Sequence, residues 1–212
     1  MPYQNRVDPA GNICIHPARG EFMGNRGGVL HDADQHIVRR QKSRAWLICV
    51  TDFKGRRRKL MQPNRYTELF FLDEVTALAA GHRPCFECRR QDALAFAEAL
   101  GVSRSEERLS APTIDALLAV ERKREPDAPE RQIAREAIPS LPDGAMIRQG
   151  DTHYALRGGR FLPWSFEGYG TPLDFDALSG APVHLATPPS TVAALRHGYR
   201  PAFHSRAWKP AT

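Results

Sequence analysis

The stretch Gly81-His82-Arg83-Pro84-Cys85-Phe86-Glu87-Cys88-Arg89-Arg90 holds two of the four cysteines of this 212-residue chain. A Cys-x-x-Cys pair that follows a glycine turn and precedes a basic helix start is typical of a zinc knuckle, in which two thiolates close a tight turn on one metal ion. The βαβ pattern that thioredoxin-like redox pairs require does not surround this motif. We therefore predict Cys85 and Cys88 to be zinc ligands rather than a redox pair.

The sequence on either side of the knuckle predicts regular structure. Asp73 is an expected helix N-cap, and Gly81 can end that helix by adopting a positive φ angle. The apolar run before a Thr-Asp-Phe-Lys-Gly turn and the basic run after it predict a β-hairpin. We expect strands over residues 45–50, 56–61 and 67–72 and helices over 74–80 and 89–100. Hairpin, knuckle and helix in this order resemble a treble-clef zinc module.

Residues 68–90, from Glu68-Leu69-Phe70-Phe71 through Ala77-Leu78-Ala79-Ala80 to Arg90, resemble the end of the zinc-binding N-terminal module of bacterial Ada DNA-repair proteins. In that module a strand and a short Ala-rich helix lead into Gly-aromatic-Arg-Pro-Cys-x-x-Cys and basic residues. The resemblance covers about a tenth of the chain. It implies that Cys85 and Cys88 bind zinc together with an earlier Cys-x-x-x-Cys, one cysteine of which accepts a methyl group from a DNA phosphotriester.

The chain departs from the Ada pattern upstream of the knuckle. It has no Cys-x-x-x-Cys there, and Cys49 is the only cysteine in the corresponding region, so it becomes the third predicted ligand. A small buried hydrophobe is the alternative role for a cysteine in such an apolar strand. Candidates for a fourth ligand are a water molecule, Cys14, His31, His36, Asp52 and His82. Three protein ligands with an open position suit a catalytic zinc, and four suit a structural one.

Positive charge is concentrated in one segment. Between Arg39 and Arg65 there are ten Lys or Arg residues and one acid, Asp52, a net charge of +9, whereas the whole chain carries +6. Such a field attracts polyanions, with nucleic acid the expected partner, although a solvated surface is the alternative explanation. The predicted nucleic-acid contacts are Arg56, Arg57, Arg58, Arg83, Arg89 and Arg90.

The remaining sequence predicts an α+β protein. A glycine-rich loop is expected over residues 20–28, where Arg19 or Arg26 could meet a phosphate. We divide the chain into an Ada-like zinc module with the basic hairpin over 1–101, a charged helical connector over 102–140, and a small β-rich domain over 141–212. Short strand candidates joined by Gly-rich turns predict an antiparallel β meander in the last part.

These patterns favour a zinc-containing, DNA-associated protein that holds the phosphate backbone through the basic hairpin and the knuckle. One alternative is a metal-dependent hydrolase or nuclease that uses His31, Asp32 or His82. Another is a structural zinc protein with a protein partner. The N-terminus lacks the apolar core of a signal peptide, and no apolar run is long enough for a membrane span. With few cysteines as well, we expect a soluble protein of the reducing cytoplasm.

Overall fold

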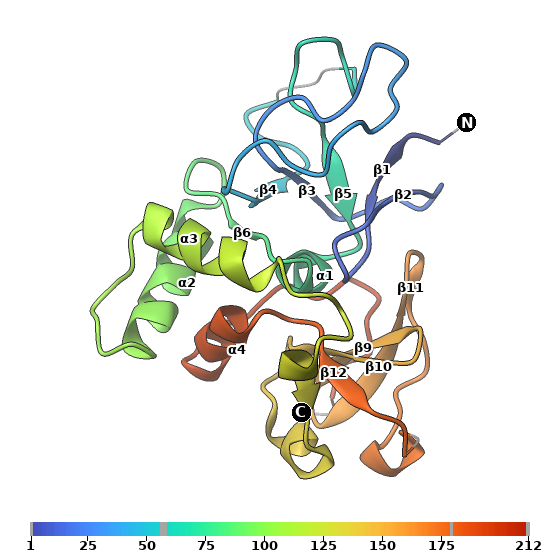
Figure 1. The fold of residues 1–212 in the computed structure, drawn as a ribbon, viewed down its shortest axis with the longest axis vertical. Coiled ribbons are helices and arrows are strands. Elements are labelled where there is room, and N and C mark those ends of the chain that lie inside the picture. Colours follow the sequence, from blue (N-terminus) through green and yellow to red (C-terminus); the bar gives the residue numbers. More distant parts are fainter. Residues whose placement is uncertain (1, 56–58, 179, 211–212) are drawn as a thin grey trace.

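The computed structural model describes residues 2–55, 59–178 and 180–210. It confirms the α+β class, because two six-stranded sheets are combined with helices. Figure 1 shows the first sheet and its long loops in the upper half, the second sheet in the lower half, and helix α1 (Glu74–Ala79) at their junction. Within the described ranges, no helix is both long enough and apolar enough to cross a membrane.

The first sheet has the order β2-β1-β5-β3-β4-β6 and mixes parallel with antiparallel pairs. Its strands are β1 (Gln4–Val7), β2 (Ile13–Ile15), β3 (Phe22–Asn25), β4 (Leu47–Val50), β5 (Leu69–Phe71) and β6 (Arg83–Pro84). The predicted strands over 45–50 and 67–72 are confirmed as β4 and β5. The chain therefore places the residue before the knuckle cysteine, Pro84, in the same sheet as Cys49.

The loop predicted over residues 20–28 is wrong in its centre, because β3 lies there and pairs with both β4 and β5. Gly24 is the reason. A Cβ atom on Gly24 would lie 2.1 Å from the Leu47 carbonyl oxygen and 2.7 Å from the Phe71 ring. Glycine thus serves close packing inside a strand at this position, and a turn is not needed.

The predicted basic hairpin is also not formed as expected. Strand β4 is hydrogen-bonded to β3 on one edge and to β6 on the other, so no edge remains for a returning strand. Lys59, Leu60 and Met61, the described part of the predicted strand over 56–61, are not in a strand. Arg56, Arg57 and Arg58 lie outside the described residues.

The second sheet is antiparallel, with the order β11-β10-β9-β8-β12-β7. Its strands are β7 (Gln132–Ile133), β8 (Met146–Gln149), β9 (Thr152–Arg157), β10 (Arg160–Ser165), β11 (Gly168–Tyr169) and β12 (Val183–Leu185). Consecutive strands from β8 to β11 are neighbours, which confirms the predicted meander.

Helices fill the space beside and between the sheets. The three longer ones are α2 (Arg90–Val102), α3 (Ala111–Glu121) and α4 (Pro189–Arg196), and the 3-10 turns are Pro129–Arg131, Arg135–Ser140 and Phe175–Ala177. Phe96 of α2 and Tyr199 after α4 meet edge to face, with ring centroids 5.2 Å apart. The main hydrophobic core therefore joins the N-terminal module to the last quarter of the chain.

Two consecutive buried carboxylates start α1 and connect the two sheets. Asp73 caps the helix by accepting from the Thr76 amide at 2.8 Å, and its other oxygen accepts from the Tyr169 hydroxyl and the His204 amide. Glu74 accepts hydrogen bonds from the two terminal guanidinium nitrogens of Arg89, at 2.8 and 2.9 Å. The same carboxylate also accepts from the Tyr199 hydroxyl and the Ala202 amide.

We predict that Glu74→Gln destabilises the protein by about 3–5 kcal/mol, because it leaves the half-exposed Asp92 as the one carboxylate paired with the buried Arg89 guanidinium among the described residues. Urea unfolding followed by circular dichroism measures the change. The control is Glu98→Gln at an exposed position of α2, expected to stay within about 0.5 kcal/mol of the parent. Equal stability of the two variants would contradict the bridging role of Glu74.

Candidate metal centre

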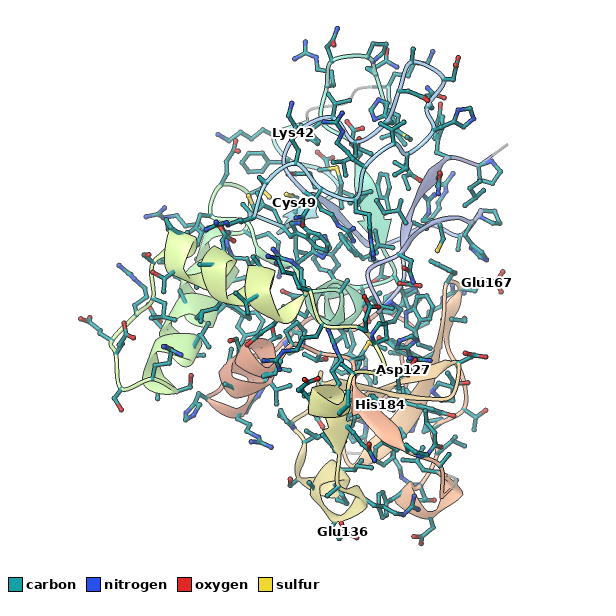
Figure 2. All side chains as sticks on the ribbon, in the orientation of Figure 1. Lys42, Cys49, Asp127, Glu136, Glu167 and His184 are labelled. Carbon is teal, nitrogen blue, oxygen red and sulfur yellow. The ribbon has the colours of Figure 1, made fainter. Side chains whose placement is uncertain are left out.

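Three cysteines from separate parts of the sequence meet at the β4–β6 edge of the first sheet. Cys49 belongs to β4, Cys85 directly follows β6, and Cys88 precedes α2. The parallel pairing of Ile48 with Pro84, and a 2.9 Å hydrogen bond from the Cys85 amide to the Ile48 carbonyl, fix the two segments side by side. Figure 2 shows the yellow sulfur atoms gathered beside the label of Cys49.

The geometry of the three sulfur atoms suits one metal ion. Their Sγ atoms all lie within 4.8 Å of one another. Tetrahedral zinc with Zn–S bonds of 2.3 Å requires sulfur atoms about 3.8 Å apart, so small side-chain adjustments would bring all three sulfur atoms within bonding distance of one zinc ion. Cys49 and Cys85 are each 7 % exposed, and Cys88 is half-buried. A metal here would be held at the sheet edge and shielded on its inner side.

Backbone amides point at the sulfur atoms. Cys85 Sγ accepts hydrogen bonds from the amides of Glu87, at 3.4 Å, and of Cys88. The Val50 amide donates to Cys88 Sγ. Hydrogen bonds of this kind favour the thiolate form, which is the form that binds metal. The knuckle turn therefore stabilises negative charge on sulfur before any side chain contributes.

The three thiols influence one another strongly. Their shared hydrogen bond lowers the pKa of Cys85 to about 5 and raises the pKa of Cys49. Burial raises the pKa of Cys88. Three adjacent thiolates repel each other, so without a cation the cluster retains protons, and a metal ion would replace those protons.

No other described His, Cys, Asp or Glu side chain completes this group. Cys14 lies on β2, at the opposite edge of the sheet from β6. His82 is fully buried, and its Nε2 accepts from Arg26 Nε at 3.2 Å. His31 is buried with its Nδ1 2.6 Å from Thr67 Oγ1. Three protein ligands are thus what the described residues offer.

The remaining fourth-ligand candidates also lie away from the thiols. Asp52 is exposed and does not belong to the cysteine group. His36 lies in a separate exposed group with Asp32 and Asp34, and its Nδ1 is 3.7 Å from the Asp32 carboxylate. Exposed acidic groups of this kind are common without a bound ion, so the cysteine cluster is the stronger metal candidate.

Two of the arginines predicted to contact nucleic acid are buried and form ion pairs inside the protein. Arg83 is 5 % exposed and forms a two-pronged ion pair with Asp115, both bonds measuring 2.8 Å. Arg89 is 7 % exposed and is held by Glu74 and Asp92. Buried guanidinium groups whose hydrogen bonds are taken by carboxylates cannot also face a DNA backbone, so these two assignments are corrected. Arg90 is exposed.

Sequence reasoning missed an arginine–tryptophan stack behind the metal centre. The Trp46 ring lies 3.6 Å from the Arg26 guanidinium carbon and 4.3 Å from that of Arg122. Arg26 is fully buried and donates to the carbonyl oxygens of Gly11 and Arg40. It is therefore a structural group and not the phosphate contact expected of a surface loop.

Comparisons with known proteins leave the resemblance to Ada as an expectation from sequence. No protein-family model matches the chain, and neither a curated protein nor a solved structure gives a significant match.

Proposed function

We propose that Cys49, Cys85 and Cys88 bind one zinc ion and that the protein uses the loops around this centre to bind the phosphate backbone of DNA. The observation that carries the proposal is the position of the basic segment. Its loops flank β4, the strand that supplies Cys49. The candidate metal site and the positively charged loops thus share strand β4.

Zinc is the metal that the donor set favours. Soft thiolate ligands select Zn²⁺, Cu⁺ or iron–sulfur clusters over Mg²⁺ and Ca²⁺. The site combines a Cys-x-x-Cys turn with one cysteine from a neighbouring strand, and backbone amides are directed at the sulfur atoms. This arrangement is typical of zinc knuckles. Such a zinc ion would fix β4 against the start of α2 and so hold the adjacent loops in place.

The described part of the basic segment is available to a polyanion. All seven of its described cationic side chains are exposed: Arg39, Arg40, Lys42, Arg44, Lys54, Lys59 and Arg65. None of them pairs with a carboxylate among the residues that the structure covers. In Figures 1 and 2 these loops form the upper end of the molecule, and Lys42 lies on the same side as Cys49. Cations of this kind supply affinity and little sequence specificity.

Binding is favoured over metal-dependent hydrolysis. The hydrolase alternative uses His31, Asp32 or His82. Both imidazoles are buried and engaged within the protein, and Asp32 belongs to an exposed group separate from the three cysteines. Methyl transfer would need an accessible acceptor thiolate, and Cys49, the candidate by analogy with Ada, is 7 % exposed. The proposal therefore concerns recognition of the phosphate backbone and does not include a chemical step.

We predict one zinc ion per chain in the purified protein, measured by elemental analysis. Cys49→Ser and Cys85→Ser should each lower the zinc content well below one, because a serine hydroxyl is a poor zinc ligand. Cys14→Ser is the matched control and should keep full occupancy. A chelator should lower the Tm of the parent and of the control, since metal binding is linked to folding. Full zinc retention by Cys49→Ser would remove that residue from the ligand set.

For DNA, we predict binding that weakens steeply as salt rises, measured by fluorescence anisotropy of a labelled duplex. The variant Lys42→Gln/Arg44→Gln/Lys54→Gln/Lys59→Gln should reduce the slope of log K against log salt by roughly 0.9 for each phosphate that the protein no longer neutralises.

The control for the DNA experiment removes the same charge from exposed positions outside the basic segment: Arg108→Gln/Arg196→Gln/Arg206→Gln/Lys209→Gln. It should leave the salt slope near that of the parent, because these side chains lie outside the basic loops. Absence of binding by the parent at low salt, or equal reductions of affinity in both variants, would contradict the proposed surface.

A further inference from the structure

A second positively charged feature lies apart from the metal centre. A cavity of about 390 Å³ opens where the end of α3 meets both sheets. Trp46 and Ala80 contribute from the N-terminal module, Ala119 from α3, and His153 and Pro188 from the last part of the chain. None of the metal-binding cysteines lines it. This volume suits a small ligand and is too small for a duplex.

The charge of the cavity wall is one-sided. A single carboxylate, that of Glu125, lies among its lining residues. Against it stand six cationic side chains: Arg40, Arg122, Lys123, Arg124, Arg131 and Arg148. They come from the β3–β4 loop, the end of α3, the connector and β8, so folding is what collects them. Like charges brought together in a partly enclosed space repel each other unless an anion joins them.

The protein itself neutralises only one of these six cations with a carboxylate of a described residue. Arg148 pairs with Asp127, which also lies 4.0 Å from His184 Nδ1, and Figure 2 shows Asp127 and His184 close together. Glu121, the nearest further acid on α3, is turned to the start of α4, where it accepts from Ser190. The remaining five cations form no salt bridge with a carboxylate of a described residue.

Hydrogen bonds to backbone carbonyl oxygens hold Arg122 and Arg131 in the cavity wall. Arg122 donates to the carbonyl oxygens of Gly81 and Arg44, both at 2.8 Å. Arg131 donates at 3.2 Å to four carbonyl oxygens, those of Glu121, Arg124, Leu185 and Ala186. The Nε atom of each guanidinium is buried and has no partner among the described residues. These bonds orient the two groups without a salt bridge to a carboxylate of a described residue, and Arg122 also stacks on Trp46, with its guanidinium carbon 4.3 Å from the ring.

Burial is the largest influence on the pKa of both guanidinium groups and outweighs the nearby carboxylates, Asp115 and Glu121 for Arg122, and Glu121 and Glu125 for Arg131. Burial lowers the pKa of Arg122 to about 10 and lowers that of Arg131. The end of α3 contributes a macrodipole of about half a negative charge, which accounts for a small part of the positive charge collected there. Stabilising a helix end therefore does not require six cations.

We infer that this cavity is a binding site for a small ligand with a diphosphate group, and Arg40 is the one described cation that it shares with the DNA surface proposed above. A diphosphate carries several negative charges, which match the positive charge of Arg122 and Arg131 in the wall, and it offers oxygen acceptors on all sides for the flexible cations at the rim. The same group occurs free, in nucleoside diphosphates and at the 5′-triphosphorylated end of an RNA strand.

The test is a calorimetric titration of the full-length protein with inorganic pyrophosphate at low salt. We expect one binding site per chain. Lys123→Gln/Arg124→Gln removes two exposed rim cations, and it should weaken binding about tenfold or more, because their charge-assisted hydrogen bonds to the ligand are no longer made. Ala119→Phe keeps every charge and fills the cavity from the partly exposed face of α3, and it should weaken binding to a similar extent.

The control is Arg108→Gln/Lys209→Gln, which removes the same charge at exposed positions outside the cavity and should bind like the parent. Circular dichroism verifies that each variant is folded. The inference is overturned if the parent does not bind pyrophosphate, if either cavity variant binds like the parent, or if the affinity of the control falls as far as that of the cavity variants.

Competition experiments separate the sources of the phosphate group. ADP competing with pyrophosphate points to a free nucleotide, and competition by a 5′-triphosphorylated RNA oligonucleotide but not by its 5′-hydroxyl form points to a strand end. The basic-loop variant of the DNA experiment should still bind pyrophosphate, because its four substituted side chains do not line the cavity. Either proposal can thus fail while the other stands.

Discussion

Everything in this structure depends on two adjacent carboxylates that are taken out of water. Asp73 and Glu74 are 0 % and 1 % exposed, and burying two unpaired charges would cost far more than a small protein can offset. Donors from both halves of the chain remove that cost. Arg89, one residue after the last knuckle cysteine, and Tyr199, beyond α4, meet on the same Glu74 carboxylate. The position of the metal centre is therefore tied to the packing of the C-terminal part.

The parts of the site that could be predicted without the resemblance to Ada are those whose residues lie close together in the sequence. Cys85 and Cys88 form a local pattern, and Cys49 was predicted because it is the only cysteine in the region that corresponds to the upstream Cys-x-x-x-Cys of Ada. The partners of the arginines were out of reach. Asp115 lies 32 residues from Arg83, and Glu74 lies 15 residues before Arg89. The one local signal was Asp92, three residues after Arg89, and an i,i+3 pair does not by itself indicate a buried guanidinium.

The fold was predictable where local rules operate and not where two strands compete for one edge. The cap at Asp73, the positive φ of Gly81 and the meander from β8 to β11 follow from local chemistry. The basic strand after β4 was excluded by β3 and β6, which already occupy both edges. Gly24 reads as a loop residue in sequence, and only the tertiary contact with Phe71 reveals why a strand needs a glycine there.

The number of thiolates bears on how the metal centre and the positive loops can coexist. Zinc with three thiolates carries a net charge of −1, whereas zinc with four carries −2, so a three-cysteine site subtracts little from the field of the seven exposed cations near it. Without zinc, the same three sulfur atoms would keep protons instead of all ionising. In the proposed function, a bound zinc ion would hold β4 against α2 at a small electrostatic cost to the attraction of phosphate.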